Sequence, residues 1–222
     1  LKDVDATFAE CGDVHYERYV DDILLLTRKR MHRKIFKRAE EAINLAGPVV
    51  HPLSATNSKS KFGRIASGVE YLGYKLGGDP SVPSVRDSSV LSLERRISRL
   101  FSDYRRRVAD TGQQKDHDAW LEASLNLIIT GCVYDGHKRG WLQYYSLMRD
   151  FALLRKLDVL VAKKVRQYGM EERLQVKSFY KSFRYAAKRG VDRTGYIPNF
   201  DSVGVTRKRE LLVLFSRFTK AD

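Results

Sequence analysis

Cysteine is scarce in this 222-residue sequence, and the two present, Cys11 and Cys132, lie far apart without the spacing of a metal site. The five histidines form no zinc pattern either. No apolar run approaches the length of a membrane span, and no signal peptide is recognisable. These absences argue against a disulfide-stapled fold, a zinc module and a membrane-spanning protein. We therefore expect a cytoplasmic protein that has no membrane partner.

Charge is plentiful and unbalanced. Charged residues make up 31% of the chain and hydrophobic residues 43%, which is typical of a globular protein. The formal net charge is +14, with a sequence pI near 9.8. Such an excess favours a polyanionic partner, with nucleic acid first and an anionic membrane surface as the rival.

Two adjacent carboxylates stand out in the tetrad Tyr19-Val20-Asp21-Asp22. Residues 14–18 before it roughly alternate, and residues 23–27 after it are almost wholly apolar, so both segments predict strands with Asp-Asp at the turn between them. Like charges this close repel each other, and a bound divalent cation usually offsets this repulsion. A metal-free Asp-Asp turn is the alternative on the tetrad alone, because Asp is a common turn residue.

The first part of the chain predicts an α+β layer. A helix ends near residue 10, an amphipathic helix covers residues 31–45, and a strand pair follows at residues 62–65 and 68–76. The Gly/Pro/Ser-rich stretch of residues 77–84 predicts a linker. We expect two domains, residues 1–78 and 79–222.

Beyond the linker nearly every segment predicts helix. Four apolar patterns of helical period end near Tyr104, Gly131, Gly169 and Phe183, and a final helix is expected over about residues 207–218. The first of these helices carries Arg95, Arg96 and Arg99 among further arginines. Several basic helices in succession favour a surface that follows a phosphate backbone, with an ordinary solvated face as the alternative.

Three segments in order resemble reverse transcriptases. Arg18–Leu25 looks like their catalytic palm hairpin, Asn57–Phe62 like the polar end of the next palm motif, and Gly68–Tyr74 like the "FLGY" hairpin, with Tyr71 where Phe is usual. The resemblance is to the bacterial group of group II intron, retron and defence-associated enzymes. Residues 125–132, with Gly140-Trp141, look most like the defence-associated branch. The fold it implies is the C-terminal half of a polymerase palm followed by an all-α, thumb-like domain.

The resemblance implies an RNA-directed DNA polymerase, a nucleotidyltransferase that uses two Mg²⁺ ions, with Mn²⁺ as a substitute. Asp21 would be the principal metal ligand and Asp22 a supporting one, both of them catalytic. Lys59 or Lys61 would approach the triphosphate or donate a proton to the leaving group. The motif spacing, one residue shorter than usual, leaves the choice between the two lysines open. The primer would be held by Tyr19, beside its terminus, and by Tyr71, Leu72, Gly73 and Tyr74.

The same resemblance places the family's fingers, and the half of its palm with the other metal-binding aspartate, before Leu1. We therefore expect this chain to be inactive alone. The implied partners are that upstream portion, an RNA template, a DNA or RNA primer, deoxynucleoside triphosphates and a noncoding RNA, in a setting such as anti-phage defence. Two alternatives stay open: a non-catalytic module that binds structural RNA, and an RNA-templated RNA polymerase or template-independent nucleotidyltransferase.

Overall fold

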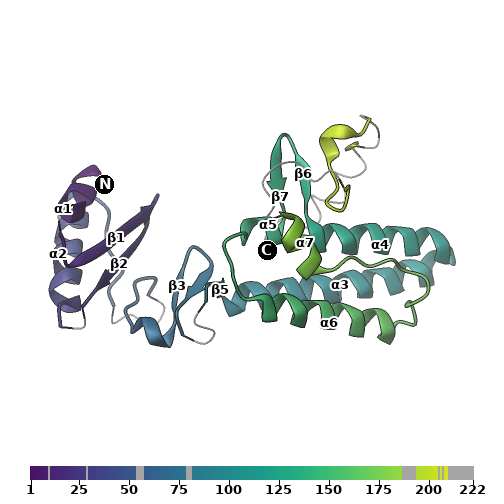
Figure 1. Cartoon of the computed structure of the whole chain (residues 1–222), viewed down its shortest axis with the longest axis horizontal. Coiled ribbons are helices and arrows are strands. Elements are labelled where there is room, and N and C mark those ends of the chain that lie inside the picture. Colours follow the sequence, from purple (N-terminus) through teal and green to yellow (C-terminus); the bar gives the residue numbers. More distant parts are fainter. Residues whose placement is uncertain are drawn as a thin grey trace. The chain divides into compact units, whose positions relative to one another are not determined.

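The chain folds as two compact units, Leu1–Asp79 and Pro80–Asp222, each of which is described by itself. The structure is a computed structural model, shown in Figure 1. It describes residues 1–9, 11–28, 30–53, 58–78, 82–186, 194–204, 206 and 208–209. The mixed α+β class expected from the sequence is confirmed, and the stretch predicted as a linker contains the division between the units.

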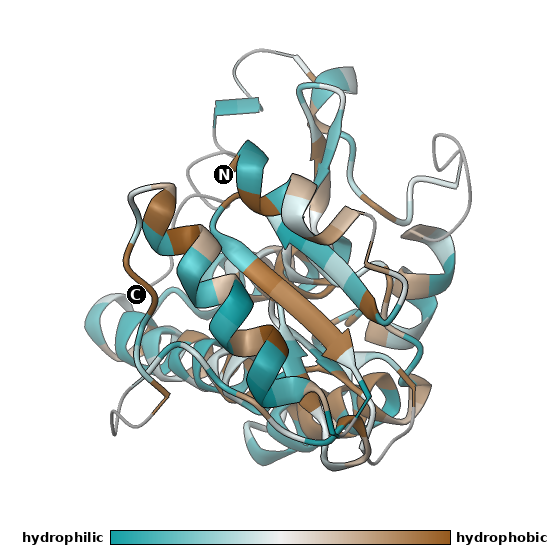
Figure 2. Ribbon diagram, turned by 90° about the vertical axis from the view of Figure 1, so that its left-hand side faces the viewer, coloured by the Kyte–Doolittle hydropathy of each residue, from teal (hydrophilic) through white to brown (hydrophobic). Residues whose placement is uncertain are grey.

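The first unit begins with two helices packed on a β-hairpin. Its elements are α1 (Lys2–Ala9), β1 (Val14–Tyr19), β2 (Asp22–Thr27) and α2 (His32–Leu45). The predicted strands and both predicted helices are thereby confirmed. The strands are antiparallel, and one face of the hairpin meets a core that includes Val4, Phe8 and Ile35. Figure 2 shows β2 as a strongly apolar strand and α2 as an amphipathic helix.

The rest of the first unit holds a short 3₁₀ turn, η1 (Ile65–Ser67), and a tight hairpin of β3 (Val69–Tyr71) and β4 (Tyr74–Leu76). The strand predicted at residues 62–65 is wrong. Phe62 instead stacks its ring on His32, with ring centroids 5.4 Å apart. The pairing expected of it is made within residues 68–76, because a two-residue turn lets that segment fold back on itself.

The second unit is mainly helical. Its principal helices are α3 (Asp87–Thr111), α4 (Gln114–Thr130), α6 (Phe151–Gln167) and α7 (Phe179–Ala186). All four helices that the apolar periodicity predicts are confirmed, and α3 buries Leu93, Ile97, Leu100, Phe101 and Tyr104. The smaller elements are β5 (Ser84–Val85), α5 (Trp141–Tyr144) and η2 (Phe200–Ser202). The helix predicted over residues 207–218 lies outside the described residues, apart from two positions near its start.

A hairpin of β6 (Cys132–Tyr134) and β7 (His137–Arg139) corrects the expectation of an all-α second domain. Its turn residues Asp135 and Gly136 have φ of 55° and 69°, the geometry of the Asp-Gly turn that closes tight hairpins. At its base, Gly131 and Gly140 lie in close contact: a Cβ on Gly140 would come 2.6 Å from the Gly131 Cα. The helical patterns on either side of this short hairpin masked its turn signal.

Candidate active site

The turn between β1 and β2 holds Val20 in a conformation that β-branched residues avoid. Tyr19 pairs with Asp22, so only Val20 and Asp21 form the loop. Val20 has φ of 56° and is 68% exposed. Such a conformation costs on the order of 1–3 kcal/mol and persists only where its surroundings fix it. Backbone strain of this kind is concentrated at functional sites, so the turn is a candidate site on geometry alone.

A charged network beneath the turn fixes it. The Arg18 guanidinium donates through Nε and Nη2 to the Asp5 carboxylate of α1, at 2.7 and 2.6 Å. Its Nη1 donates to the Val20 carbonyl at 2.8 Å. The Tyr16 hydroxyl donates to Asp5 at 2.6 Å. One guanidinium thus joins α1 to the strained residue of the turn.

The electrostatics of this network keep Asp5 ionised. The hydrogen bond from Arg18, followed by that from Tyr16, holds the pKa of the Asp5 carboxyl well below its usual range. Burial, followed by the hydrogen bond to Asp5, raises the pKa of Tyr16 to about 12. At neutral pH the cluster is therefore a carboxylate bound to a guanidinium and a neutral phenol.

The second hairpin reaches the first through Tyr71. The Tyr71 hydroxyl donates a long hydrogen bond of 3.4 Å to the backbone carbonyl of Asp22, 49 residues earlier in the chain. Burial raises the pKa of Tyr71, as do the charges of Asp22 and Glu17. The structure therefore brings together two segments that the sequence singles out separately. Tyr71 is the last residue of β3 and immediately precedes the turn between β3 and β4.

That turn consists of Leu72 and Gly73, with φ of 49° and 79°. Both angles lie in the left-handed region, which Gly73 adopts freely and Leu72 adopts at a cost. Tyr74 follows as the first residue of β4 and pairs with Tyr71. The four predicted primer-holding residues thus form one hairpin end.

Residues 19–22 form the end of the β1–β2 hairpin, which we call the tip. Tyr19, Asp21 and Asp22 are all exposed there, and Tyr19 is 63% exposed. Within the described residues, no group of three or more His, Cys, Asp or Glu side chains could hold a metal ion. Two adjacent carboxylates without such a cage suit Mg²⁺, which is usually held by one or two carboxylates together with waters and substrate phosphates. Asp21 and Asp22 therefore fit Mg²⁺ as a partial ligand set.

The two lysines predicted to act in catalysis, Lys59 and Lys61, lie in a loop that follows α2. Lys59 and Lys61 are exposed, and within the described part of the chain neither makes a hydrogen bond or an ion pair with Asp21 or Asp22. Their loop is ordered by the Ser60 amide, which donates to the Ser58 hydroxyl at 3.1 Å, and by the ring contact of Phe62. Asn57 lies outside the described residues. The choice between the two lysines stays a prediction.

Comparison with protein-family models, curated proteins and solved structures finds no significant match for this chain.

Sequence reasoning missed Asp5 and Arg18 as parts of the tip. In the sequence, Asp5 is only one residue of the helix that ends near residue 10, and Arg18 is only the start of a motif. A signal was present, because Tyr16 and Arg18 alternate with exposed residues of β1 and so face the helices. An arginine on that inward face needs a buried or half-buried acceptor, and Asp5 of α1 supplies it in the structure.

Most of the net positive charge belongs to the second unit. Residues 80–222 contain 28 of the 41 lysines and arginines but only 16 of the 27 acidic residues. The predicted nucleic-acid-binding residues Arg95, Arg96 and Arg99 all lie on α3. Arg95 and Arg99 are exposed and one helical turn apart, on the same face. No helix within the described residues is long and apolar enough to cross a membrane.

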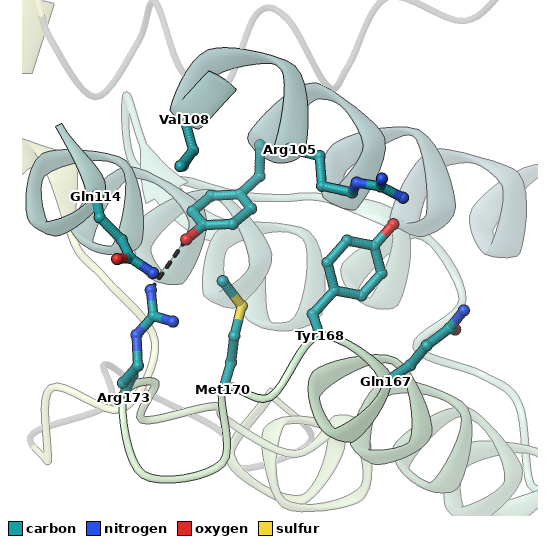
Figure 3. A pocket seen from close by; sticks show the side chains of 8 residues that line it. Arg105, Val108, Gln114, Gln167, Tyr168, Met170 and Arg173 are labelled. Carbon is teal, nitrogen blue, oxygen red and sulfur yellow. Dashed lines mark hydrogen bonds between the residues drawn. The ribbon is translucent and has the colours of Figure 1, made fainter. Parts of the chain in front are cut away.

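A cavity of about 360 Å³ in the second unit is the other candidate site. Figure 3 shows side chains that line it, among them Arg173. The Arg173 Nη2 donates to the Tyr104 hydroxyl at 3.0 Å. The Arg173 guanidinium binds the Asp118 carboxylate at 2.6 and 2.9 Å, and Tyr104 donates to the same carboxylate at 2.7 Å. These hydrogen bonds hold α3, α4 and the segment after α6 together. The polar groups of Tyr104, Asp118 and Arg173 beside the cavity therefore have a structural role.

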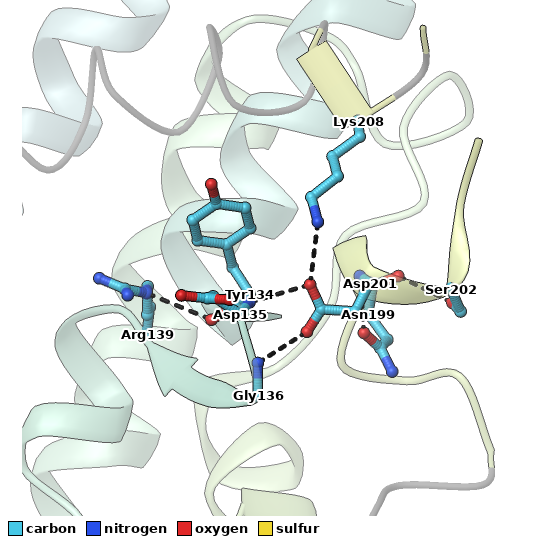
Figure 4. Close-up of polar contacts among 8 residues, drawn as sticks. All are labelled: Tyr134, Asp135, Gly136, Arg139, Asn199, Asp201, Ser202 and Lys208. Atoms are coloured by element: carbon cyan, nitrogen blue, oxygen red, sulfur yellow. Dashed lines mark hydrogen bonds and ion pairs between the residues drawn. The ribbon is translucent and has the colours of Figure 1, made fainter. Parts of the chain in front are cut away.

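A second polar cluster holds the turn of the β6–β7 hairpin (Figure 4). The Asp201 carboxylate accepts from the backbone amides of Asp135 and Gly136, each at 2.9 Å, and from Lys208 at 3.1 Å. The amide hydrogen bonds, from Gly136 first, lower the pKa of Asp201. This cluster ties the 194–204 segment to the hairpin, and its polar groups satisfy one another.

Proposed function

We propose that the chain supplies the palm hairpin and a thumb-like unit of an RNA-directed DNA polymerase, a reverse transcriptase of the bacterial type. The observation that carries the proposal is the strained Val20-Asp21 turn, which presents two adjacent carboxylates and is contacted by Tyr71 of the second hairpin. A metal-free Asp-Asp turn has no need of strain at Val20. The three motifs that resemble this family support the same reading.

In this mechanism Asp21 and Asp22 would hold Mg²⁺, and an aspartate from the part of the palm that precedes this hairpin in the family would complete the site. The bound metal would lower the pKa of a primer 3′-hydroxyl and neutralise charge on the leaving pyrophosphate. The 3′-hydroxyl would give up its proton to solvent, and its oxygen would form a bond to the α-phosphorus as the bond from that phosphorus to the pyrophosphate oxygen breaks. Lys59 or Lys61 donates a proton from Nζ to the pyrophosphate oxygen. The exposed ring of Tyr19 packs beside the primer terminus.

The second hairpin holds the primer strand in this proposal. Leu72 and Gly73 turn the backbone tightly, and Gly73 allows a close approach of a nucleotide that a side chain would block. Tyr71 joins this hairpin to the carboxylate tip. The basic face of α3 would contact phosphates of the duplex.

The deciding experiment is primer extension by the full-length protein on an RNA template with deoxynucleotides. We expect extension that requires Mg²⁺ and falls by at least about a thousandfold in Asp21→Ala, since the metal ligand stabilises charge in the transition state. Asp13→Ala removes an exposed carboxylate at the other end of the same hairpin and serves as the matched control. Full extension by Asp21→Ala would contradict the proposal.

A second candidate is a module that binds structural RNA without catalysis, favoured by the net positive charge of the second unit. It predicts salt-sensitive RNA binding that Asp21→Ala leaves unchanged, and no incorporation of nucleotides under any condition. Comparing deoxynucleotides with ribonucleotides, each with and without template, separates both candidates from an RNA polymerase or a terminal transferase.

A further inference from the structure

We propose that Asp5 and Arg18 are positioning residues, which set the orientation of the Asp21 and Asp22 carboxylates through the Val20 carbonyl. The inference concerns the geometry of the tip, and its catalytic consequence rests on the proposed function. Neither residue touches substrate or metal in this scheme. Asp5 acts through Arg18, and Arg18 acts through the backbone of the turn.

Three nitrogens of the Arg18 guanidinium are used as donors, two toward Asp5 and one toward the turn. Nε and Nη2 bind Asp5 side by side at 2.7 and 2.6 Å, which fixes the plane of the guanidinium. Nη1 then points at the Val20 carbonyl and binds it at 2.8 Å. A lysine has a single rotatable ammonium and lacks this planar fork, so it cannot reproduce the two-sided contact.

The restraint falls at the point where the backbone most needs it. Val20 is highly exposed and strained, so side-chain packing contributes little to holding its φ at 56°. Its carbonyl belongs to the peptide unit that leads into Asp21. Fixing that peptide plane fixes the direction in which Asp21 leaves the turn, because the peptide group is planar.

The anchor at the other end is firm. Asp5 lies on α1, between the buried core residues Val4 and Phe8. Tyr16 donates a further hydrogen bond to it at 2.6 Å. The Arg18 and Asp5 side chains are 26% and 37% exposed, so water has partial access to the ion pair but does not replace it. The hydrogen bonds from Arg18 to Asp5 and from Arg18 to the Val20 carbonyl therefore connect the exposed turn to a helix that is held in the core.

The same hairpin offers a matched control. At its other end Arg28 and Asp13 form an ion pair at 3.8 Å, with side chains 84% and 51% exposed. Mutating this pair makes the same changes of side chain and charge as mutating Arg18 and Asp5, at residues for which no contact with the turn is found in the described part of the chain. The test variants are therefore Arg18→Lys and Asp5→Asn, and the controls are Arg28→Lys and Asp13→Asn.

The first measurement is amide hydrogen exchange of residues 19–23 in the full-length protein. We expect Arg18→Lys and Asp5→Asn to speed exchange there roughly tenfold, the factor expected for one charge-assisted hydrogen bond. Exchange in α2 should stay as in wild type. A variant that is merely unfolded would speed exchange in α2 as well, so the Ile35 and Ala39 amides report on the fold.

The second measurement is the Mg²⁺ concentration at half-maximal primer extension. We expect it to rise about tenfold or more in both test variants, as is typical when a residue that orients a metal ligand is changed. Activity at saturating Mg²⁺ should fall much less. The double variant should show no further loss, because both residues act through one contact.

The outcomes separate the two claims. Unchanged exchange at residues 19–23 in Arg18→Lys, or an effect equal to that of Arg28→Lys, overturns the positioning role whatever the activity. Faster exchange confined to these residues, in a protein whose wild type extends no primer, supports the positioning role and overturns the polymerase proposal. Faster exchange with a raised Mg²⁺ requirement supports both.

Discussion

Val20 is a β-branched residue where Asn, Asp or Gly would be expected. A two-residue hairpin loop with positive φ at its first position favours residues without a branched Cβ. Valine at φ of 56° keeps a local strain that Arg18 and the strand register hold in place. Stability alone does not explain the choice, whereas the function proposed for this turn would.

Replacing Val20 with glycine tests this interpretation. Glycine adopts positive φ freely, and this relief offsets the larger entropy that glycine loses on folding. We expect Val20→Gly to leave the free energy of unfolding unchanged or to raise it by up to about 1 kcal/mol. Urea denaturation of the full-length protein, followed by a probe in the first unit, measures the change.

Val49 supplies the control for that substitution. It is 86% exposed and its φ is not positive, so Val49→Gly brings only the entropic cost. We expect it to destabilise the first unit by about 0.5–1 kcal/mol. A Val20→Gly variant as destabilised as Val49→Gly would show that the turn carries no strain.

The two cysteines should differ sharply in reactivity. Burial raises the pKa of the Cys132 thiol to about 12, and its side chain is fully buried. The thiolate is the reactive form, so Cys132 stays unreactive at neutral pH until the second unit unfolds. We expect maleimide to label the half-buried Cys11 first, and Cys132 only in denaturant. Mass spectrometry of the labelled peptides distinguishes them, and rapid native labelling of Cys132 would contradict its burial.

At the scale of elements, the sequence predicts those whose signal is periodic. Leu93, Ile97 and Leu100 recur with the helical period and are all buried in α3. The β6–β7 hairpin was missed because three-residue strands are too short for a period to show. The strand at residues 62–65 was predicted wrongly because Phe62 is apolar, as a strand residue often is. In the structure its ring stacks on His32 instead of packing in a sheet.

Some residues of the candidate site could be predicted from local sequence patterns, and others could not. Asp21 and Asp22 were identified because their position between two apolar strands is a local pattern. Asp5 was not, since its contact with Arg18 spans 13 residues and depends on how α1 packs on the hairpin. The contact of Tyr71 with Asp22 is likewise tertiary. Local signals therefore found the candidate metal ligands, and only the structure shows the contacts that we propose orient them.

The base of the β6–β7 hairpin should tolerate no side chain at Gly140. Its φ is 125°, and a Cβ there would lie 2.6 Å from the Gly131 Cα. Backbone strain and overpacking together should make Gly140→Ala lose about 3 kcal/mol of unfolding free energy. Gly169→Ala is the control, because φ there is 63° but no atom lies within 4 Å of the new Cβ. We expect about 1 kcal/mol for it, measured by thermal unfolding, and equal losses would contradict the close contact.

The turn of this hairpin should loosen in acid. The pKa of Asp201 is lowered in the folded state by the amides of Gly136 and Asp135, so its contribution to stability is present in full above the unfolded pKa of about 4. That contribution is lost as the pH falls through the lower folded value. We expect the amide resonances of Asp135 and Gly136 to titrate below about pH 4. Asp201→Asn should abolish the titration, and its persistence would assign it to another group.

At the scale of the whole molecule, charge and candidate chemistry lie in different units. The carboxylate tip belongs to Leu1–Asp79, whereas most of the excess positive charge belongs to Pro80–Asp222. Binding of a polyanion and catalysis should therefore respond to different substitutions. Under the proposed function, the second unit contributes affinity for the phosphate backbone and the first contributes the reacting groups.

Salt dependence of RNA binding tests this division. If Arg95 and Arg99 each neutralise a phosphate, the combined Arg95→Gln and Arg99→Gln variant should bind RNA more weakly, and the slope of log affinity against log salt should fall by about two. Arg33→Gln with Lys37→Gln removes the same charge from exposed positions on α2 of the first unit and serves as the control. We expect that control to keep the wild-type slope, since screened charges act locally at physiological salt. Equal loss of slope in both variants would mean that RNA responds only to net charge, and α3 would then have no special part in binding.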